Sequence, residues 1–179
     1  ITSAEDAAMH KLAERLHLPV SHIPLDTDGF ALFMLDDMLS LQKTPADKGF
    51  QINVNFSSAA FTYRRELGGG KNQPMGKAIG LNKKSNLVVI DATAGMGKDA
   101  FVLAGLGCRV TMLEQSVIVG ALLEDGLNRG KADGAIQSII EKLSLKIVNS
   151  CEYLASSFCQ LQMLFILTLC ILIEKNQRK

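Results

Sequence analysis

Residues 87–100 read Leu87-Val88-Val89-Ile90-Asp91-Ala92-Thr93-Ala94-Gly95-Met96-Gly97-Lys98-Asp99-Ala100, and residues 110–114 read Val110-Thr111-Met112-Leu113-Glu114. Each stretch is an apolar run of strand length that ends in a carboxylate, and the first continues through a glycine turn into a helix. Glycines let the backbone approach a ligand closely, and an acid after the second strand can accept hydrogen bonds from a ribose. The two stretches therefore predict an adenosine-binding edge of an open α/β sheet.

The glycine turn fits one kind of phosphate loop poorly. A P-loop needs G-x-x-x-x-G-K-[ST], but Ala92 stands where its first glycine belongs and Asp99 replaces the hydroxyl residue. A dinucleotide fold needs G-x-G-x-x-G/A, which Gly95, Gly97 and Ala100 match.

The acid at the end of the first strand separates the remaining alternatives. Asp91 would repel a pyrophosphate bound at the helix N-terminus, whereas it suits the cationic aminoacyl part of S-adenosylmethionine. The pattern therefore favours S-adenosylmethionine over NAD, and a tight turn without any ligand stays as a third alternative. Lys98 and Asp99 open the helix, where Asp99 either contacts the ligand or only complements the helix dipole.

Composition sets broad limits. The chain has 179 residues, 47% hydrophobic and 21% charged, with a formal net charge of +1, which neither indicates nor excludes a nucleic-acid partner. Its four cysteines form no CxxC pair, so we expect reduced cysteines, no metal site and a cytoplasmic protein. The most apolar run, residues 163–173, is shorter than the ~20 residues a bilayer needs, so no membrane partner is expected.

The pattern along the chain predicts an α/β protein in four parts. Residues 1–66 form a small α+β subdomain, with a helix over 4–16 and antiparallel strands in 30–35, 38–41 and 51–56. Residues 67–86 are a glycine-rich basic linker with a helix over 74–79. Residues 87–155 form a Rossmann-like βαβαβ part with strands near 87–91, 109–114 and 145–149, and helices over 98–106 and 116–143, the latter broken near Gly130. Residues 156–179 are an apolar tail.

Basic residues gather in 64–84, where six lysines and arginines face one acid. With the glycines at 68–70 between them, Arg64, Arg65 and Lys71 could follow an RNA backbone, although a solvated face explains them equally well. Phe61 and Tyr63 could stack on a base, but we expect both in the core.

The chain resembles the ribosomal RNA small subunit methyltransferase J family over residues 17–155. The matching stretches are Arg64-Arg65-x-x-Gly68-Gly69-Gly70, Asp91-Ala92-Thr93-Ala94-Gly95-x-Gly97-x-Asp99-Ala100-Phe101-Val102-Leu103-Ala104, Gly107-Cys108-Arg109-Val110-x-Met112-Leu113-Glu114 and Leu122-Leu123-x-Asp125-Gly126-Leu127. The resemblance implies an incomplete class I methyltransferase sheet and transfer of a methyl group from S-adenosylmethionine to the N2 amine of a guanosine. The substrate would be 16S rRNA or the small ribosomal subunit.

The resemblance also implies cofactor contacts at three places in the chain. They are Lys98 and Asp99, Glu114 and Gln115, and Asn149 and Ser150. The family has Arg at the Lys98 and Gln115 positions and Ser at Asn149, so the chain departs from the family there.

A family motif on the next strand, Leu-Asp-Pro-Met-aromatic-Pro-His, is absent from this chain, so catalytic residues are not assigned. One back-translation of Met163–Lys179, shifted by one base, restores that motif. We therefore expect that a frameshift between about Ser156 and Gln162 replaced the C-terminal part with an out-of-frame tail. The first strand of the sheet would then expose an edge, leaving a marginally folded and inactive polypeptide. The alternatives are an NAD-binding oxidoreductase half-domain and an inactive RNA-binding pseudoenzyme fragment.

Overall fold

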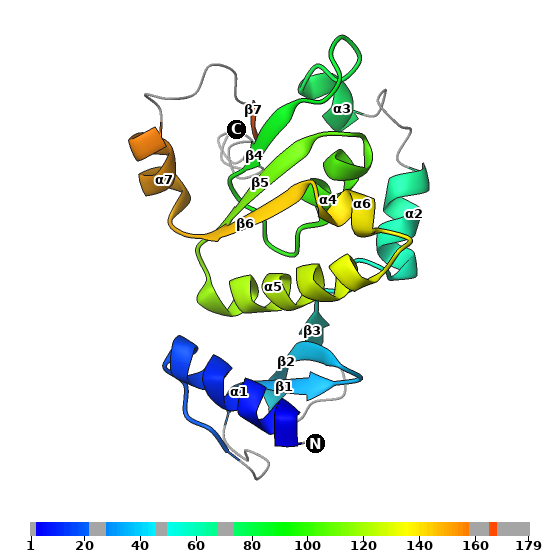
Figure 1. Cartoon of the computed structure of the whole chain (residues 1–179). Coiled ribbons are helices and arrows are strands. Elements are labelled where there is room, and N and C mark those ends of the chain that lie inside the picture. The colour runs from blue at the N-terminus through cyan, green and yellow to red at the C-terminus, as the bar shows by residue number, and fades with distance from the viewer. Residues whose placement is uncertain (1–2, 22–27, 46–49, 68–73, 158–164, 168–179) are drawn as a thin grey trace, which may run out of the picture. The chain divides into compact units, whose positions relative to one another are not determined.

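The computed structural model describes the chain except for residues 1–2, 22–27, 46–49, 68–73, 158–164 and 168–179. It divides into two compact units, Ile1–Val54 and Asn55–Lys179, each with its own sheet (Figure 1). Lys71, the glycines at 68–70 and most of the C-terminal tail lie outside the described residues.

The N-terminal unit combines one helix with a three-stranded antiparallel sheet in the order β1-β2-β3. Its elements are α1 (Ser3–Leu16), β1 (Gly29–Leu35), β2 (Met38–Thr44) and β3 (Gln51–Asn53). Asp36 and Asp37 both have positive φ, so they form the two-residue turn that matches the twist of a hairpin. The predicted helix and the three antiparallel strands are confirmed, although β3 is shorter than expected.

The second unit is built on a parallel sheet in the order β6-β5-β4-β7. Its strands are β4 (Val88–Asp91), β5 (Arg109–Glu114), β6 (Leu143–Ile147) and β7 (Phe165–Leu167). Its helices are α2 (Ala59–Leu67), α3 (Pro74–Ala78), α4 (Lys98–Gly105), α5 (Val117–Ala132), α6 (Gln137–Ile140) and α7 (Ser150–Ser157). The predicted alternation of strands and helices from residue 87 onward is therefore present.

The core of this unit joins the sheet to its helices. Phe56, Phe61 and Phe101 pack ring against ring, with centroids 5.1 to 5.5 Å apart, and so join α2 to α4. A second cluster of buried side chains includes Ile90 and Leu113, and Tyr153 and Leu154 of α7 pack against it. Because successive residues of a strand face opposite sides, β4 and β5 bury side chains on both faces.

Two expectations are wrong. Tyr63 is 67% exposed, whereas Phe61 is in the core as predicted. Both lie in α2, where residues two apart point to nearly opposite sides, so one core cannot hold both. The expected open edge of β4 is also absent over Val89–Asp91, because β7 pairs with it in parallel register. An apolar segment with the β-forming residues Phe165 and Ile166 can take the neighbouring strand position.

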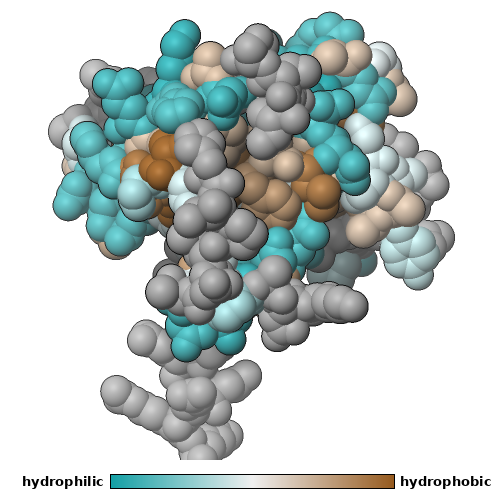
Figure 2. All heavy atoms as spheres, turned by 90° about the horizontal axis from the view of Figure 1, so that it is seen from below, coloured by the Kyte–Doolittle hydropathy of each residue, from teal (hydrophilic) through white to brown (hydrophobic). Residues whose placement is uncertain are grey.

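Large apolar side chains are also exposed. The surface seen from below shows apolar patches among hydrophilic residues (Figure 2). In the N-terminal unit the exposed large apolar residues are Leu18, Val20, Phe30, Leu35 and Phe50. The rings of Phe30 and Phe50 pack edge to face with centroids 5.8 Å apart.

Candidate cofactor site

The predicted site residues converge on the carboxyl ends of three parallel strands. Asp91 ends β4, Glu114 ends β5, and Asn149 follows β6. Parallel pairing brings these ends to one edge, because Asp91 lies opposite Met112 and Glu114 opposite Ile147. In open α/β sheets this edge is where ligands bind.

The turn after β4 contains two glycines with different roles. Gly97 is the N-cap of α4 with φ +70, and a Cβ there would lie 3.0 Å from Leu123 Cδ2 and 3.2 Å from Phe56 Cζ. Gly95 has φ +51, but the nearest atom to a Cβ there would be the Thr93 carbonyl oxygen at 3.9 Å. Gly97 therefore faces the packed core, whereas Gly95 faces open space.

Asp91 is a buried carboxylate, only 4% exposed. The pKa of Asp91 is raised to about 6, mainly by burial and to a smaller extent by the nearby charges of Asp99 and Glu114, while the hydrogen bond from the backbone N–H of Thr93 lowers it. That N–H donates to Asp91 Oδ1 at 3.2 Å. A cation bound beside Asp91 would favour its ionised form.

Glu114 holds two loops together. Its Oε2 accepts a hydrogen bond from the backbone N–H of Gly95 at 3.0 Å, and its Oε1 accepts one from Ser116 at 2.8 Å. The Ser116 side chain in turn caps α5 by accepting from Val119 N–H. The carboxylate therefore fixes the glycine turn against the start of α5.

Asn149 and Ser150 organise the third side of the edge. Asn149 Oδ1 caps α7 by accepting from Cys151 N–H at 3.0 Å and Glu152 N–H at 3.2 Å. Its Nδ2 donates to Gln115 Oε1 at 3.4 Å, so two residues proposed from the resemblance do meet. The Ser150 hydroxyl donates to the Ala92 carbonyl, which ties α7 to the end of β4.

The other predicted residues that the structure describes lie in the helices α4 and α2. Lys98 is exposed on the first turn of α4, and Asp99 follows it in that turn. Arg64 and Arg65 lie in α2, away from the glycine turn in sequence. Among the described residues no group of three or more His, Cys, Asp or Glu side chains is arranged to hold a metal ion.

Three partners of this site were not predicted from the sequence. Backbone groups of Thr93 and Ser116 donate to the two acids, and the Ala92 carbonyl accepts from Ser150. The Ser116 capping pattern, a serine directly before an apolar helix, could have been found in the sequence. The bonds between distant segments had no sequence signal.

Known proteins resemble this chain in sequence and in fold. Residues 11–167 match the family model described as "Putative SAM-dependent methyltransferase". The chain belongs to this family. The cofactor of the family is S-adenosylmethionine, and the residues of the edge fit it, since three carboxylates and an open glycine turn suit a ligand with a cationic part.

Curated relatives are named ribosomal RNA small subunit methyltransferase J. The protein of Pseudomonas syringae pv. tomato is 44% identical over 144 residues, which cover 80% of this chain and 52% of the relative. That of Aliivibrio fischeri is 46% identical over 132 residues, which cover 73% and 51%. The chain thus spans about half the length of the curated relatives it matches.

A solved structure also resembles the chain. It is a SAM-dependent methyltransferase of Neisseria gonorrhoeae, 30% identical, with a TM-score of 0.70 over 95% of this chain and 69% of the other. The likeness covers both the N-terminal unit and the parallel sheet, so the Rossmann-like fold class predicted from sequence is confirmed.

Proposed function

We propose that the carboxyl edge of the parallel sheet binds S-adenosylmethionine through the residues predicted from sequence. They are Asp91, Gly95, Gly97, Lys98, Asp99, Glu114, Gln115, Asn149 and Ser150. The observation that carries the proposal is the buried Asp91 carboxylate below the glycine turn, with Asp99 and Glu114 nearby. This edge has the wrong charge for the pyrophosphate of NAD and the right one for an ammonium or sulfonium group.

We further propose that the activity served by this site is methyl transfer to the N2 amine of a guanosine in 16S rRNA, in the cytoplasm. The names of the curated relatives support an RNA substrate, and the guanosine target comes from the resemblance. When bound, S-adenosylmethionine supplies an electrophilic methyl group. The chain's own contribution is to orient the cofactor and exclude other geometries, because such a reaction gains mostly from positioning.

Each side chain then has a defined task. Asp91 would face the aminoacyl part, and Glu114 would accept ribose hydroxyls while keeping its bonds to Gly95 and Ser116, since each carboxylate oxygen has two lone pairs. The pair formed by Gln115 and Asn149 would border the adenine. Arg64, Arg65 and Lys71 remain candidates for contact with the RNA.

Calorimetric titration separates this proposal from its alternatives. The chain is titrated with S-adenosylhomocysteine and, separately, with NADH. We expect binding of the first and none of the second. Binding of NADH alone would support an oxidoreductase half-domain instead, and binding of rRNA without either small ligand would support a pseudoenzyme fragment.

A further inference from the structure

The opposite edge of the parallel sheet, where the strands begin, collects basic side chains. Lys83 and Lys84 precede β4, Arg109 is the first residue of β5, and Lys142 directly precedes β6. Lys83, Lys84 and Arg109 are exposed, and Lys142 is half-buried. Three separate loops therefore each bring at least one cation to the same edge.

Hydrogen bonds fix these loops side by side. Arg109 N–H donates to the Leu87 carbonyl at 2.9 Å, and Val110 N–H donates to the Lys142 carbonyl at 2.9 Å. The Asn86 side-chain oxygen lies 3.7 Å from the position of a Cβ on Gly107, so the loop before β4 contacts the loop before β5. The basic edge, defined as Lys83, Lys84, Arg109 and Lys142, thus extends over the starts of three neighbouring strands.

Acids are scarce in the segments that form this edge. Residues 71–90 and 100–113 contain no Asp or Glu, and Glu141 is the one acid in 134–146. Its Oε1 accepts a hydrogen bond from Gln137 Nε2 at 2.9 Å. The Lys142 ammonium donates to the Ser138 carbonyl and so keeps its charge at the surface.

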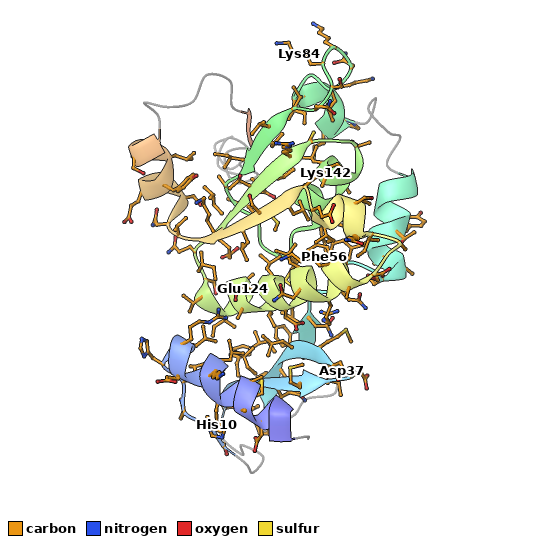
Figure 3. The ribbon with its side chains drawn as sticks, viewed as in Figure 1. His10, Asp37, Phe56, Lys84, Glu124 and Lys142 are labelled. Atoms are coloured by element: carbon orange, nitrogen blue, oxygen red, sulfur yellow. The ribbon has the colours of Figure 1, made fainter. Side chains whose placement is uncertain are left out.

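The two ends of the sheet consequently carry opposite charge. On β5, Arg109 at the basic edge and Glu114 at the cofactor edge are separated by about 17 Å, five residues at about 3.3 Å each. Lys84 lies at the outer tip of the loop before β4, and Lys142 lies at the start of β6 (Figure 3). A surface of this kind attracts a polyanion, and it does so on the edge away from the glycine turn.

We propose that the basic edge is a second contact surface for the phosphate backbone of RNA, separate from the cofactor edge. The inference rests on the proposed function for the identity of the polyanion. Lys and Arg side chains are common partners of phosphate groups, and such contacts position a nucleic acid without reading its sequence. A protein partner would normally find an aromatic anchor at the centre of its interface, and residues 81–88 and 106–110 offer none.

The role of this surface is to hold a large RNA while its target base reaches the other edge. Substrate affinity would then depend on residues that make no contact with the cofactor. Arg109 begins β5 and Lys142 directly precedes β6, and the backbone N–H groups of Lys83 and Lys84 donate to the Gly80 carbonyl. Because hydrogen-bonded backbone holds all four side chains, they are positioning residues in this sense.

The test compares two variants of equal charge. Lys83→Gln, Arg109→Gln and Lys142→Gln are combined in the edge variant. Lys11→Gln, Lys43→Gln and Lys131→Gln, all exposed and outside the basic edge, are combined in the control. Binding of a fluorescein-labelled 20-nucleotide single-stranded RNA is measured by anisotropy over a range of salt concentrations. Circular dichroism melts check that both variants fold.

We expect the edge variant to bind RNA at least about tenfold more weakly at low salt. Its salt slope should be reduced by about 2, because each phosphate neutralised on a single strand contributes roughly 0.7 to that slope. The control keeps the affinity and slope of the unaltered chain. An equal loss of RNA affinity in both variants would overturn the proposal. Polyglutamate of matched charge that displaced the labelled RNA as well as unlabelled RNA does would also overturn it. The affinity for S-adenosylhomocysteine is expected to be the same in all three proteins. If the unaltered chain did not bind S-adenosylhomocysteine, that result would count against the proposed function alone.

Discussion

Glu114 Oε2 accepts a hydrogen bond from the backbone N–H of Gly95 at 3.0 Å, joining the end of β5 to the glycine turn nineteen residues earlier. The other carboxylate oxygen accepts from Ser116 at 2.8 Å. One side chain thus shapes both loops that would surround an adenosine. A hydrogen bond to a charged group contributes about 1.5 to 3 kcal/mol, so the Glu114 carboxylate stabilises this arrangement of the loops. Its remaining lone pairs are still available to accept hydrogen bonds from a ligand.

Glu114→Gln is expected to weaken binding of both S-adenosylhomocysteine and 5′-methylthioadenosine by roughly tenfold to a hundredfold. The glutamine amide has only one oxygen that can accept. Its NH2 group would therefore face one of the two backbone N–H groups that donate to the carboxylate in the unaltered chain. Calorimetry with the two ligands measures the loss. Both ligands contain the ribose, so a loss confined to S-adenosylhomocysteine would contradict this role.

Binding of S-adenosylhomocysteine should weaken as the pH falls below 6. Burial raises the Asp91 pKa to about 6, and a cationic aminoacyl group interacts favourably only with the ionised carboxylate. The association constant is expected to fall by about tenfold per pH unit below that value and to level off above pH 7. 5′-Methylthioadenosine lacks the aminoacyl group and serves as the control. If its affinity fell in parallel, Asp91 would not face that group.

Asp91→Asn is expected to stabilise the ligand-free chain at pH 7.5 by about 2 kcal/mol and to lower its affinity for the cofactor. Between pH 3.8 and about 6 the folded state binds the Asp91 proton more tightly than the unfolded state. The stability of the unaltered chain therefore rises as the pH falls through this window, and the advantage of the variant disappears. Urea unfolding at pH 4.5 and 7.5 measures the difference, and the asparagine oxygen can still accept from Thr93.

Asp133→Asn provides a control of opposite sign. The hydroxyl of Ser57 and the N–H of Ala135 donate to Asp133 and lower its pKa. The ionised form is thus favoured in the folded state, and this contribution is present at neutral pH and lost as the pH falls through the lowered pKa. The variant should lose stability at pH 7.5. A gain at pH 7.5 in both variants would show a general effect of removing an acid.

The elements with strong local patterns could be predicted from the sequence. Apolar runs ending in Asp91 and Glu114 mark β4 and β5, and the helix that follows the glycine turn begins at Lys98 as expected. The third strand lies at Leu143–Ile147, two residues earlier than the predicted 145–149. Its alternation of Leu143, Leu145 and Ile147 with polar residues is the signal that places it correctly.

The parts of the fold and of the site that could not be predicted depend on contacts between residues that are far apart in the chain. The helix α2 is not predicted by the local pattern, because its one buried aromatic residue, Phe61, is held by rings at Phe56 and Phe101 from other segments. The bond between Ser150 and the Ala92 carbonyl spans 58 residues. Spacing in a sequence carries no information about such pairs until the sheet brings the strand ends together.

The two glycines of the turn should respond differently to alanine. In Gly97→Ala the new Cβ meets Leu123, Phe56 and Met112 at 3.0 to 3.4 Å, and positive φ adds strain, so we expect a loss of about 2 to 4 kcal/mol of folding stability. In Gly95→Ala only the positive φ is unfavourable, at about 1 kcal/mol, but the methyl group enters the space in front of the turn. That variant should fold and bind S-adenosylhomocysteine at least about tenfold more weakly. Thermal melts and calorimetry on both proteins separate the effects. Undiminished affinity in Gly95→Ala would mean that the cofactor lies elsewhere, because a ligand held against this turn leaves no room for a Cβ.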